Sequence, residues 1–241
     1  HRDLHSFPTR RSSDLQGNVL VTVTDGTGSQ SVLQVSVIRK VKAIIVAGSG
    51  PYTGNHLWDA TLACVQHAYK VLQYQGYTHD TIQLLASDTT LDIDGDGMFN
   101  EVDAHATAND LRRSIIEWEP DAGDVLVYLT GHGSDGYFKI DQNEHVDART
   151  LNNWLNTLED SADGTLTIVY DACRAGSFIP HLISDTGKQR IILTSAAPNE
   201  NAYFTSIGSL SFSNLFWTQI HKGANISDAF FIAKNAIEFT Y

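Results

Sequence analysis

Five short apolar runs constrain this chain more than any other feature, because they alternate with longer stretches that have helical periodicity. The apolar runs cover residues 43–48, 81–87, 124–131, 165–172 and 190–197. The helical stretches cover residues 57–75, 108–118, 148–159, 209–221 and 225–239. Nearly continuous apolar strands that alternate with helices indicate a parallel sheet buried on both faces. We therefore predict an α/β sandwich whose central sheet has about six mostly parallel strands.

The segment before residue 42 has a different character. Two runs of alternating, β-branched residues at 19–24 and 31–38 flank the turn sequence DGTGSQ, which predicts a β-hairpin. We interpret residues 16–41 as the remnant of a preceding β-sandwich-like module. Residues 1–15 show no helical or strand period, and we interpret them as a non-native or disordered leader. We expect the main domain at 42–241, and we interpret its C-terminus as truncated because the sequence stops at Tyr241 within a helical pattern.

Charge and composition exclude several classes of protein. The net charge of −12 argues against nucleic-acid binding, which usually needs a basic face. No stretch approaches the ~18 apolar residues of a membrane span. Cys64 and Cys173 are the only cysteines, so a disulfide framework does not organise the fold.

Two reactive side chains follow consecutive long strands of the predicted sheet. His132 lies in LTGHGSDG after the run 124–131, and Cys173 lies in YDACRAGS after the run 165–172. The carboxyl ends of parallel strands meet at one edge, where ligands bind. A thiolate beside an imidazole can perform covalent acyl transfer, with the N–H groups of Gly133 and Cys173 as candidate oxyanion donors.

Each residue taken alone has a plainer interpretation. A lone cysteine at a strand end is usually a small buried hydrophobe, and a lone histidine in a glycine-rich turn is usually structural. Cys64 lies in a helical pattern and is interpreted as core. The chain lacks GxSxG, HExxH and CxxC motifs, so serine-hydrolase and zinc chemistry have little support and no catalytic cofactor is expected.

At GHGSDG and YDACRAGSF the sequence resembles the caspase-like peptidases of clan CD, and among them the legumain (C13) family. The resemblance extends over about residues 42–241, through VAGSGPYTGN near the start and IILTSAAPNENAYF near the end. It implies a three-layer α/β/α fold and a cysteine endopeptidase acting on peptides or proteins. It also implies that His132 and Cys173 form the catalytic dyad, Gly133 donates to the oxyanion and Asn55 supports the histidine.

The resemblance leaves specificity open. Legumains place a basic residue shortly after the supporting asparagine, whereas this chain reads NHLWDAT, and they have Glu where this chain has Asp171. We predict a P1 preference for either Asn/Asp or Arg/Lys. Asp171 could alternatively do no more than bond nearby backbone. Ser195 and Ala196 are expected to line the substrate cleft.

Residues 92–103 read DIDGDGMFNEVD and resemble an EF-hand or dockerin-type calcium loop. Seven carboxylates and no Lys or Arg lie between Asp88 and Asp110, so without a cation this segment would repel itself. We predict a structural Ca²⁺ ion, whereas the alternative is a solvated acidic loop. The expected ligands are Asp92, Asp94, Asp96, the carbonyl of Met98 and Asp103, with a possible contribution from Asn100.

The sequence therefore predicts an endopeptidase or transpeptidase that works through a Cys173 thioester. Two alternatives stay open: a caspase-like binding module without activity, and a calcium-stabilised adhesive domain of a surface protein. The acidic charge, the calcium loop and the hairpin suggest a secreted or cell-surface bacterial protein. The oligomeric state is left open.

Overall fold

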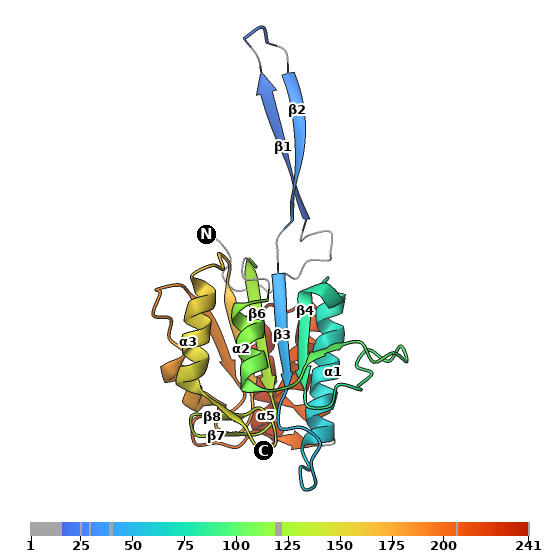
Figure 1. The fold of residues 1–241 in the computed structure, drawn as a ribbon, viewed down its shortest axis with the longest axis vertical. Coiled ribbons are helices and arrows are strands. Elements are labelled where there is room, and N and C mark those ends of the chain that lie inside the picture. Colours follow the sequence, from blue (N-terminus) through green and yellow to red (C-terminus); the bar gives the residue numbers. More distant parts are fainter. Residues whose placement is uncertain are drawn as a thin grey trace.

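The computed structural model describes residues 16–24, 26–28, 30–38, 41–118, 122–205 and 207–240. The proposed leader at 1–15 lies outside the described residues. Strands β1 (Gln16–Thr24) and β2 (Gln30–Ile38) pair antiparallel, as the alternating pattern predicted. In Figure 1 this hairpin extends away from the rest of the molecule, on the side where β3 begins. That it belongs to a preceding module stays a prediction.

A six-stranded sheet forms the centre of the molecule, in the order β11-β10-β6-β3-β4-β5. Every neighbouring pair in it is parallel. Its strands are β3 (Val41–Ala47), β4 (Ile82–Ala86), β5 (Val102–Ala104), β6 (Asp124–Thr130), β10 (Leu166–Asp171) and β11 (Arg190–Thr194). Five of them coincide with the apolar runs. The short strand β5 has no apolar run and was not predicted.

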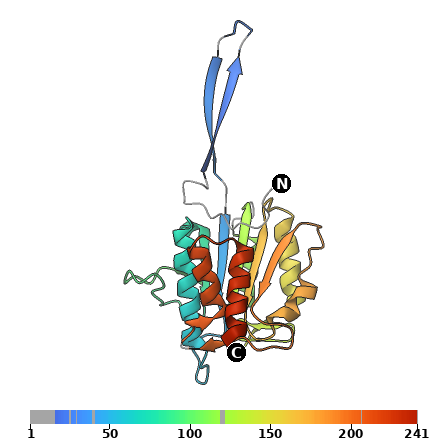
Figure 2. The ribbon, with the colours of Figure 1, turned by 180° about the vertical axis from the view of Figure 1, so that it is seen from behind.

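Helices cover both faces of this sheet and complete a three-layer α/β/α sandwich, as predicted. Figures 1 and 2 show α2 (Ala108–Ile116) and α3 (Ala148–Glu159) on one face. The other face carries α1 (Trp58–Tyr74), α4 (Phe212–His221) and α5 (Ile226–Thr240). No helix among the described residues is long and apolar enough to cross a lipid bilayer.

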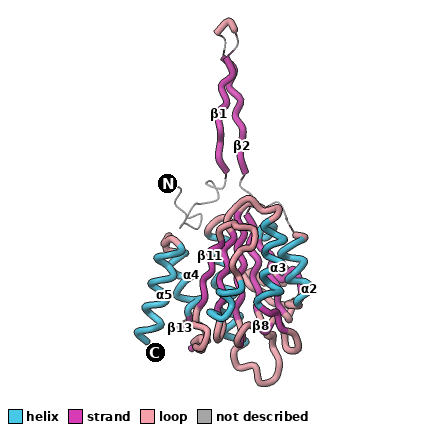
Figure 3. The backbone as a smooth tube through the Cα atoms, turned by 90° about the vertical axis from the view of Figure 1, so that its left-hand side faces the viewer, coloured by secondary structure: helices cyan, strands magenta, loops and turns pink. Residues whose placement is uncertain are grey.

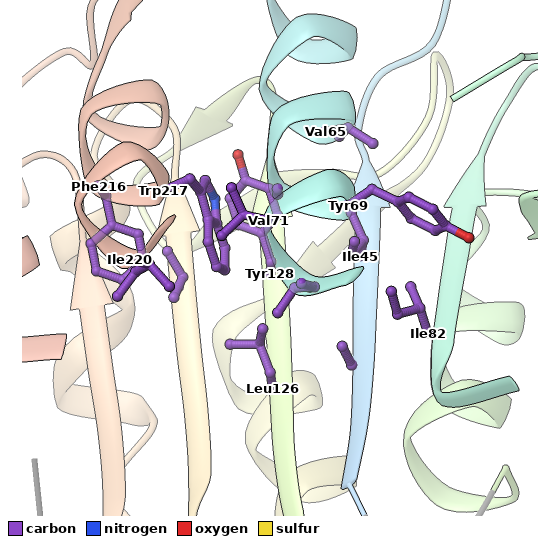
Figure 4. Packing of buried hydrophobic residues seen from close by; sticks show 14 of the residues in the cluster. Ile45, Val65, Tyr69, Val71, Ile82, Leu126, Tyr128, Phe216, Trp217 and Ile220 are labelled. Atoms are coloured by element: carbon purple, nitrogen blue, oxygen red, sulfur yellow. The ribbon is translucent and has the colours of Figure 1, made fainter. Parts of the chain in front are cut away.

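Each layer boundary has its own apolar core. Alternate residues of β6 point to opposite faces, so Tyr128 packs with Trp217 of α4 in an edge-on arrangement, 5.3 Å between ring centroids, while Leu129 packs on the α2–α3 side. Figure 4 shows the first core, where Tyr69 and Trp217 lie over strands β3 and β6. Burial on both faces explains why these strands have no polar alternation.

Small antiparallel elements surround the carboxyl ends of the strands. Strands β7 (Gly133–Ser134), β8 (Tyr137–Lys139) and β9 (His145–Asp147) form a sheet directly after His132. Strands β12 (Phe204–Thr205) and β13 (Leu210–Ser211) form a second small ribbon that leads into α4. Figure 3 shows β8 and β13 at the end of the molecule away from the β1–β2 hairpin. These short elements were not predicted, because two or three residues carry no periodic signal.

Candidate active site

The register between two central strands brings the predicted dyad to one place. Thr130 at the end of β6 pairs with Asp171 at the end of β10, and the N–H of Gly131 donates to the Asp171 carbonyl at 3.2 Å. His132 and Cys173 each lie two residues beyond this pair. The structure thus places both at the same edge of the sheet, with Cys173 half-buried and Cys64 fully buried.

Gly133 lies directly against the Cys173 segment. A Cβ atom built on Gly133 would come within 2.5 Å of the Cys173 carbonyl oxygen and 2.6 Å of the Tyr170 hydroxyl. Real Cβ atoms do not approach other heavy atoms so closely, so only glycine fits here. The close approach places the backbone after His132 against the backbone of Cys173.

Asn55 contacts the histidine although 77 positions separate them in the chain. Its Oδ1 lies 2.9 Å from Nε2 of His132 and also accepts the N–H of Leu57 at 3.1 Å. Its Nδ2 donates to the carbonyl of Gly50 at 2.7 Å. The two backbone partners fix the orientation of the amide, so an oxygen faces the imidazole and Nε2 is the donor. Neutral His132 then carries its proton on Nε2 and leaves Nδ1 as the acceptor.

The imidazole of His132 is half-buried. Burial lowers the pKa of His132, and the nearby positive charge of Lys139 lowers it further. Lys139 donates from Nζ to the hydroxyl of Tyr52 at 2.7 Å, and its Nζ lies 4.5 Å from the centre of the Tyr52 ring. A neutral imidazole, ready to accept a proton, is therefore the favoured form near neutral pH.

The chain turns sharply after Cys173. Arg174 has a left-handed backbone with φ of 58°, and its N–H donates to the Glu200 carbonyl at 2.7 Å. A short 3-10 helix, η3 (Ala175–His181), follows this turn. Gly176 lies against the 196–198 segment, donates to the Ala196 carbonyl at 2.9 Å and leaves no room for a Cβ. These contacts join the turn after Cys173 to the segment after β11.

A groove of about 850 Å³ lies beside this turn. Its walls include Gly176 and Ile179 of η3, the 194–201 segment with both Ser195 and Ala196, and Phe230 of α5. The structure thus places two of the three predicted substrate-binding residues in one groove next to the cysteine turn.

The third predicted substrate-binding residue, Asp171, is fully buried. Its Oδ2 accepts hydrogen bonds from the N–H and the hydroxyl of Ser213, in the first turn of α4. Its Oδ1 and the hydroxyl of Ser195 have no hydrogen-bond partner among the described residues. Burial raises the pKa of Asp171, although the Ser195 and Ser213 hydroxyls oppose this rise. Ser195 therefore lies close to the carboxylate without reaching hydrogen-bond geometry.

A family model described as the Peptidase C13 family matches residues 102–234, which is more than half of the chain and includes both His132 and Cys173. The chain belongs to the peptidase C13 family. This membership makes it a cysteine peptidase in its general class, with a peptide or protein as substrate. Asn55 lies outside the matched range.

A solved structure supports the fold. The crystal structure of caspase-1 from Spodoptera frugiperda superposes with a TM-score of 0.58 at 13% sequence identity. The superposition covers 84% of this chain and 78% of the caspase. At this identity the likeness shows the caspase-like fold alone. No curated protein sequence matches the chain.

In this C13 chain the acidic loop lies between β4 and β5. Ligand atoms of Asp92, Asp94 and Glu101 lie within 4.8 Å of one another. Asp92 also accepts the N–H groups of Gly95 and Gly97, at 2.6 and 3.0 Å. The structure thus brings together two of the predicted ligands and one residue, Glu101, that the EF-hand pattern did not include.

Asp103, expected at the last ligand position, is directed elsewhere. Its Oδ2 accepts the N–H of Leu84 at 2.8 Å, so it holds β5 against β4. Glu101 is only 2% exposed and accepts the N–H of Ile93 at 3.0 Å. Asp96 accepts the N–H of Met98 at 2.8 Å and lies outside the three-residue cluster. An alignment to the EF-hand pattern missed Glu101, because the strand pairing of β5 decides which carboxylate turns inward.

Proposed function

We propose that this C13 chain is a cysteine endopeptidase or transpeptidase in which Cys173 is the nucleophile and His132 the general acid and base. The observation that carries the proposal is the packing of Gly133 against Cys173 beside an imidazole oriented by Asn55. Positioning alone can supply several kcal/mol of a reaction barrier. A binding module would not require a glycine at the contact or an asparagine behind the histidine.

The proposed reaction has two steps, formation of a thioester on Cys173 and its displacement by a second nucleophile. His132 takes the thiol proton, and the sulfur of Cys173 adds to the substrate carbonyl carbon while the oxyanion receives hydrogen bonds from the Gly133 and Cys173 N–H groups. The C–N bond then breaks, and the imidazolium gives its proton to the leaving amine. In the second step the imidazole takes a proton from water or an incoming amine, which displaces the thiolate. Hydrolysis and transpeptidation differ only in this second nucleophile.

The buried carboxylate of Asp171 gives a rule for the P1 side chain. An acceptor oxygen without a partner, next to the Ser195 hydroxyl, favours a side chain that donates hydrogen bonds. Arg, Lys and Asn donate, whereas Asp does not. We therefore propose a P1 preference for Arg or Lys, with Asn as the next choice. The P1 side chain would reach Asp171 when the side chains that cover this carboxylate move aside.

A fluorogenic peptide library varied at P1, assayed with the parent and with Cys173→Ala in the presence of calcium, tests both proposals. Turnover must vanish in Cys173→Ala. The P1 preference must weaken in Asp171→Asn, which removes the carboxylate. It must persist in Ser213→Ala, which removes only the hydrogen bond from the Ser213 hydroxyl to Asp171 and keeps the carboxylate. No turnover by folded parent protein would favour the non-catalytic module, and turnover that survives in Cys173→Ala would mean that another residue is the nucleophile.

Labelling supplies a second readout for the nucleophile. Burial raises the pKa of the Cys64 thiol to about 12, with the charge of Asp171 adding to the effect, so Cys64 should not react in the folded protein. A thiol-directed probe should therefore modify Cys173 alone. Equal modification of both cysteines in native protein would count against a reactive site at Cys173.

We also propose a structural calcium ion in the 92–103 loop. The convergence of three carboxylates within 4.8 Å supports it, because like charges at this distance repel unless a cation lies between them. Asp92, Asp94 and Glu101 would hold the ion, with further oxygens from the loop. A secreted or cell-surface location, where calcium is plentiful, is proposed on the same ground.

A further inference from the structure

A second pocket lies against the histidine. It has a volume of about 270 Å³ and is lined by Tyr52, His132, Gly133, Ser134, Lys139 and His145. The groove beside Ser195 and Ala196 is lined by η3 and the segment after β11. The two hollows therefore have different walls. The pocket beside His132 is formed by Tyr52 and by residues 132–145, whereas the groove beside Ser195 is formed by segments that follow Cys173.

The chemistry of the dyad indicates which half of the substrate this pocket would bind. In the proposed function, on which this inference rests, the imidazole protonates the leaving amine while the acyl half stays bonded to Cys173. The leaving half of the substrate must therefore pass the imidazole. The pocket that His132 lines is accordingly the place where side chains after the scissile bond would lie.

The charge in this pocket is positive. Lys139 uses one of its three N–H donors on the Tyr52 hydroxyl, and among the described residues no carboxylate forms an ion pair with it. Its charge is close enough to lower the pKa of His132. His145 and Ser134, both exposed, add further hydrogen-bonding groups at the rim.

Asp135 is exposed in the turn between β7 and β8, and it forms no ion pair with Lys139 among the described residues. The carboxylates that follow Lys139 in the chain are engaged elsewhere. Asp141 accepts backbone N–H groups of Asn143 and Glu144, and Asp147 caps the first turn of α3. Glu144 accepts the N–H of Ala108 at 2.9 Å. In a chain with 28 acidic and 16 basic residues, a lysine beside the dyad with no ion-pair partner among the described residues suits an anionic ligand.

We infer that the pocket formed by Tyr52, Lys139 and His145 binds a carboxylate on the leaving side of the scissile bond, and so selects substrates that are acidic there. The carboxylate can come from an Asp or Glu side chain just after the scissile bond, or from the C-terminus of a short leaving segment. Both present the same planar anion to Lys139.

The test uses quenched peptides that share one acyl half. Three amidated peptides carry Glu, Gln or Lys directly after the scissile bond, and a fourth carries Gln as its last residue with a free carboxylate. The ratio of kcat/KM values for Glu over Gln should be about fivefold at low salt, which corresponds to one partly exposed ion pair. It should decrease as salt is added. A preference confined to the fourth peptide would identify the C-terminal carboxylate as the ligand.

Variants at Lys139 separate charge from structure. At pH 8, where the imidazole is neutral in every variant, Lys139→Met should reduce the Glu/Gln ratio to about one, and Lys139→Arg should keep it. Lys222→Met, an exposed lysine at the end of α4, should behave as the parent. A parent enzyme without acidic preference, or a preference that survives in Lys139→Met, would overturn the inference.

A binding measurement keeps the inference separate from the proposed function. The affinities of uncleaved Glu and Gln peptides for Cys173→Ala protein, with and without Lys139→Met, need no turnover. If the parent cleaves nothing but Cys173→Ala protein binds the Glu peptide more tightly in a Lys139-dependent way, the proposed function fails and the acidic subsite stands. Equal affinity for the two peptides would overturn the subsite.

Discussion

The Oδ1 atom of Asn55 lies 2.9 Å from Nε2 of His132, and the same amide is held on both sides by the backbone of residues 50 and 57. The glycine-rich loop after β3 therefore decides which nitrogen of the histidine carries the proton. This is the same logic by which a buried carboxylate fixes the tautomer in serine peptidases, with a neutral amide in place of the charge.

Replacing Asn55 tests this relationship. Asn55→Ala should lower kcat/KM by at least about tenfold, because the imidazole loses its orientation while general acid–base catalysis as a whole contributes about 10²–10⁴-fold. Asn55→Asp should keep the acceptor and move the acid limb of the pH–rate profile upward, since a carboxylate raises the histidine pKa. Asn143→Ala is the matched control. Full activity of Asn55→Ala would contradict an orienting role.

The pH dependence follows from the lowered pKa of His132. The neutral imidazole accepts the thiol proton, so activity should fall only as pH drops below the pKa of His132, which lies below its ordinary value of 6.5. Removing the charge in Lys139→Met should raise this pKa and move the acid limb to higher pH, because burial alone then depresses it. A profile of kcat/KM over roughly pH 4 to 8 measures the acid limb of the parent and of Lys139→Met. An unchanged limb in Lys139→Met would mean that the lysine charge does not reach the imidazole.

Gly133→Ala should remove activity without unfolding the protein. The added methyl group would meet the Cys173 carbonyl oxygen, a backbone atom that can move only with the nucleophile turn. Displacing one oxyanion donor costs on the order of 10²–10³-fold in kcat. Gly26→Ala in the hairpin turn, where nothing lies within 4 Å, is the control. Circular dichroism of both variants should match the parent, and a fully active Gly133→Ala enzyme would disprove the close approach.

A buried ion pair at the amino-terminal end of β11 predicts a stability effect. Arg190 donates from Nε to Oε1 of Glu159 at 2.7 Å, and their side chains are 2% and 3% exposed. Arg190→Met should lower the free energy of unfolding by about 3–5 kcal/mol, because Glu159 keeps a buried charge without its partner. Urea denaturation measures it. Arg112→Met, which breaks an exposed pair with Glu117, should cost about 0–1 kcal/mol. Similar decreases in the free energy of unfolding of the two variants would show that burial does not determine how much an ion pair contributes to stability.

Calcium should stabilise the folded protein. Ca²⁺ at a hundred times its dissociation constant would add about 2.7 kcal/mol and raise the melting temperature, and a chelator should reverse the gain. Glu101→Gln should reduce the response more than Asp103→Asn, because Glu101 joins the cluster while Asp103 binds Leu84. An unchanged melting temperature at millimolar calcium would refute the ion site.

The sequence by itself determined the layers of this protein. Apolar runs predicted five of the six strands of the central sheet, because burial on both faces of a parallel sheet leaves a continuous signal. Helical periods predicted all five α-helices of the described residues within a few residues. The same pattern predicted that His132 and Cys173 emerge at one edge of the sheet, since each follows the end of one of two neighbouring parallel strands.

Only the tertiary structure decided what surrounds the dyad. Lys139 and Tyr52 come from different strands and loops, and nothing in the spacing of 87 positions indicates that they touch. The sequence pattern did not show that the first turn of α4 binds Asp171, or that Glu101 joins Asp92 and Asp94 in the acidic loop. Periodicity records which face a residue occupies, whereas long-range packing selects its partners, and these partners set the charge and the proton positions of the site.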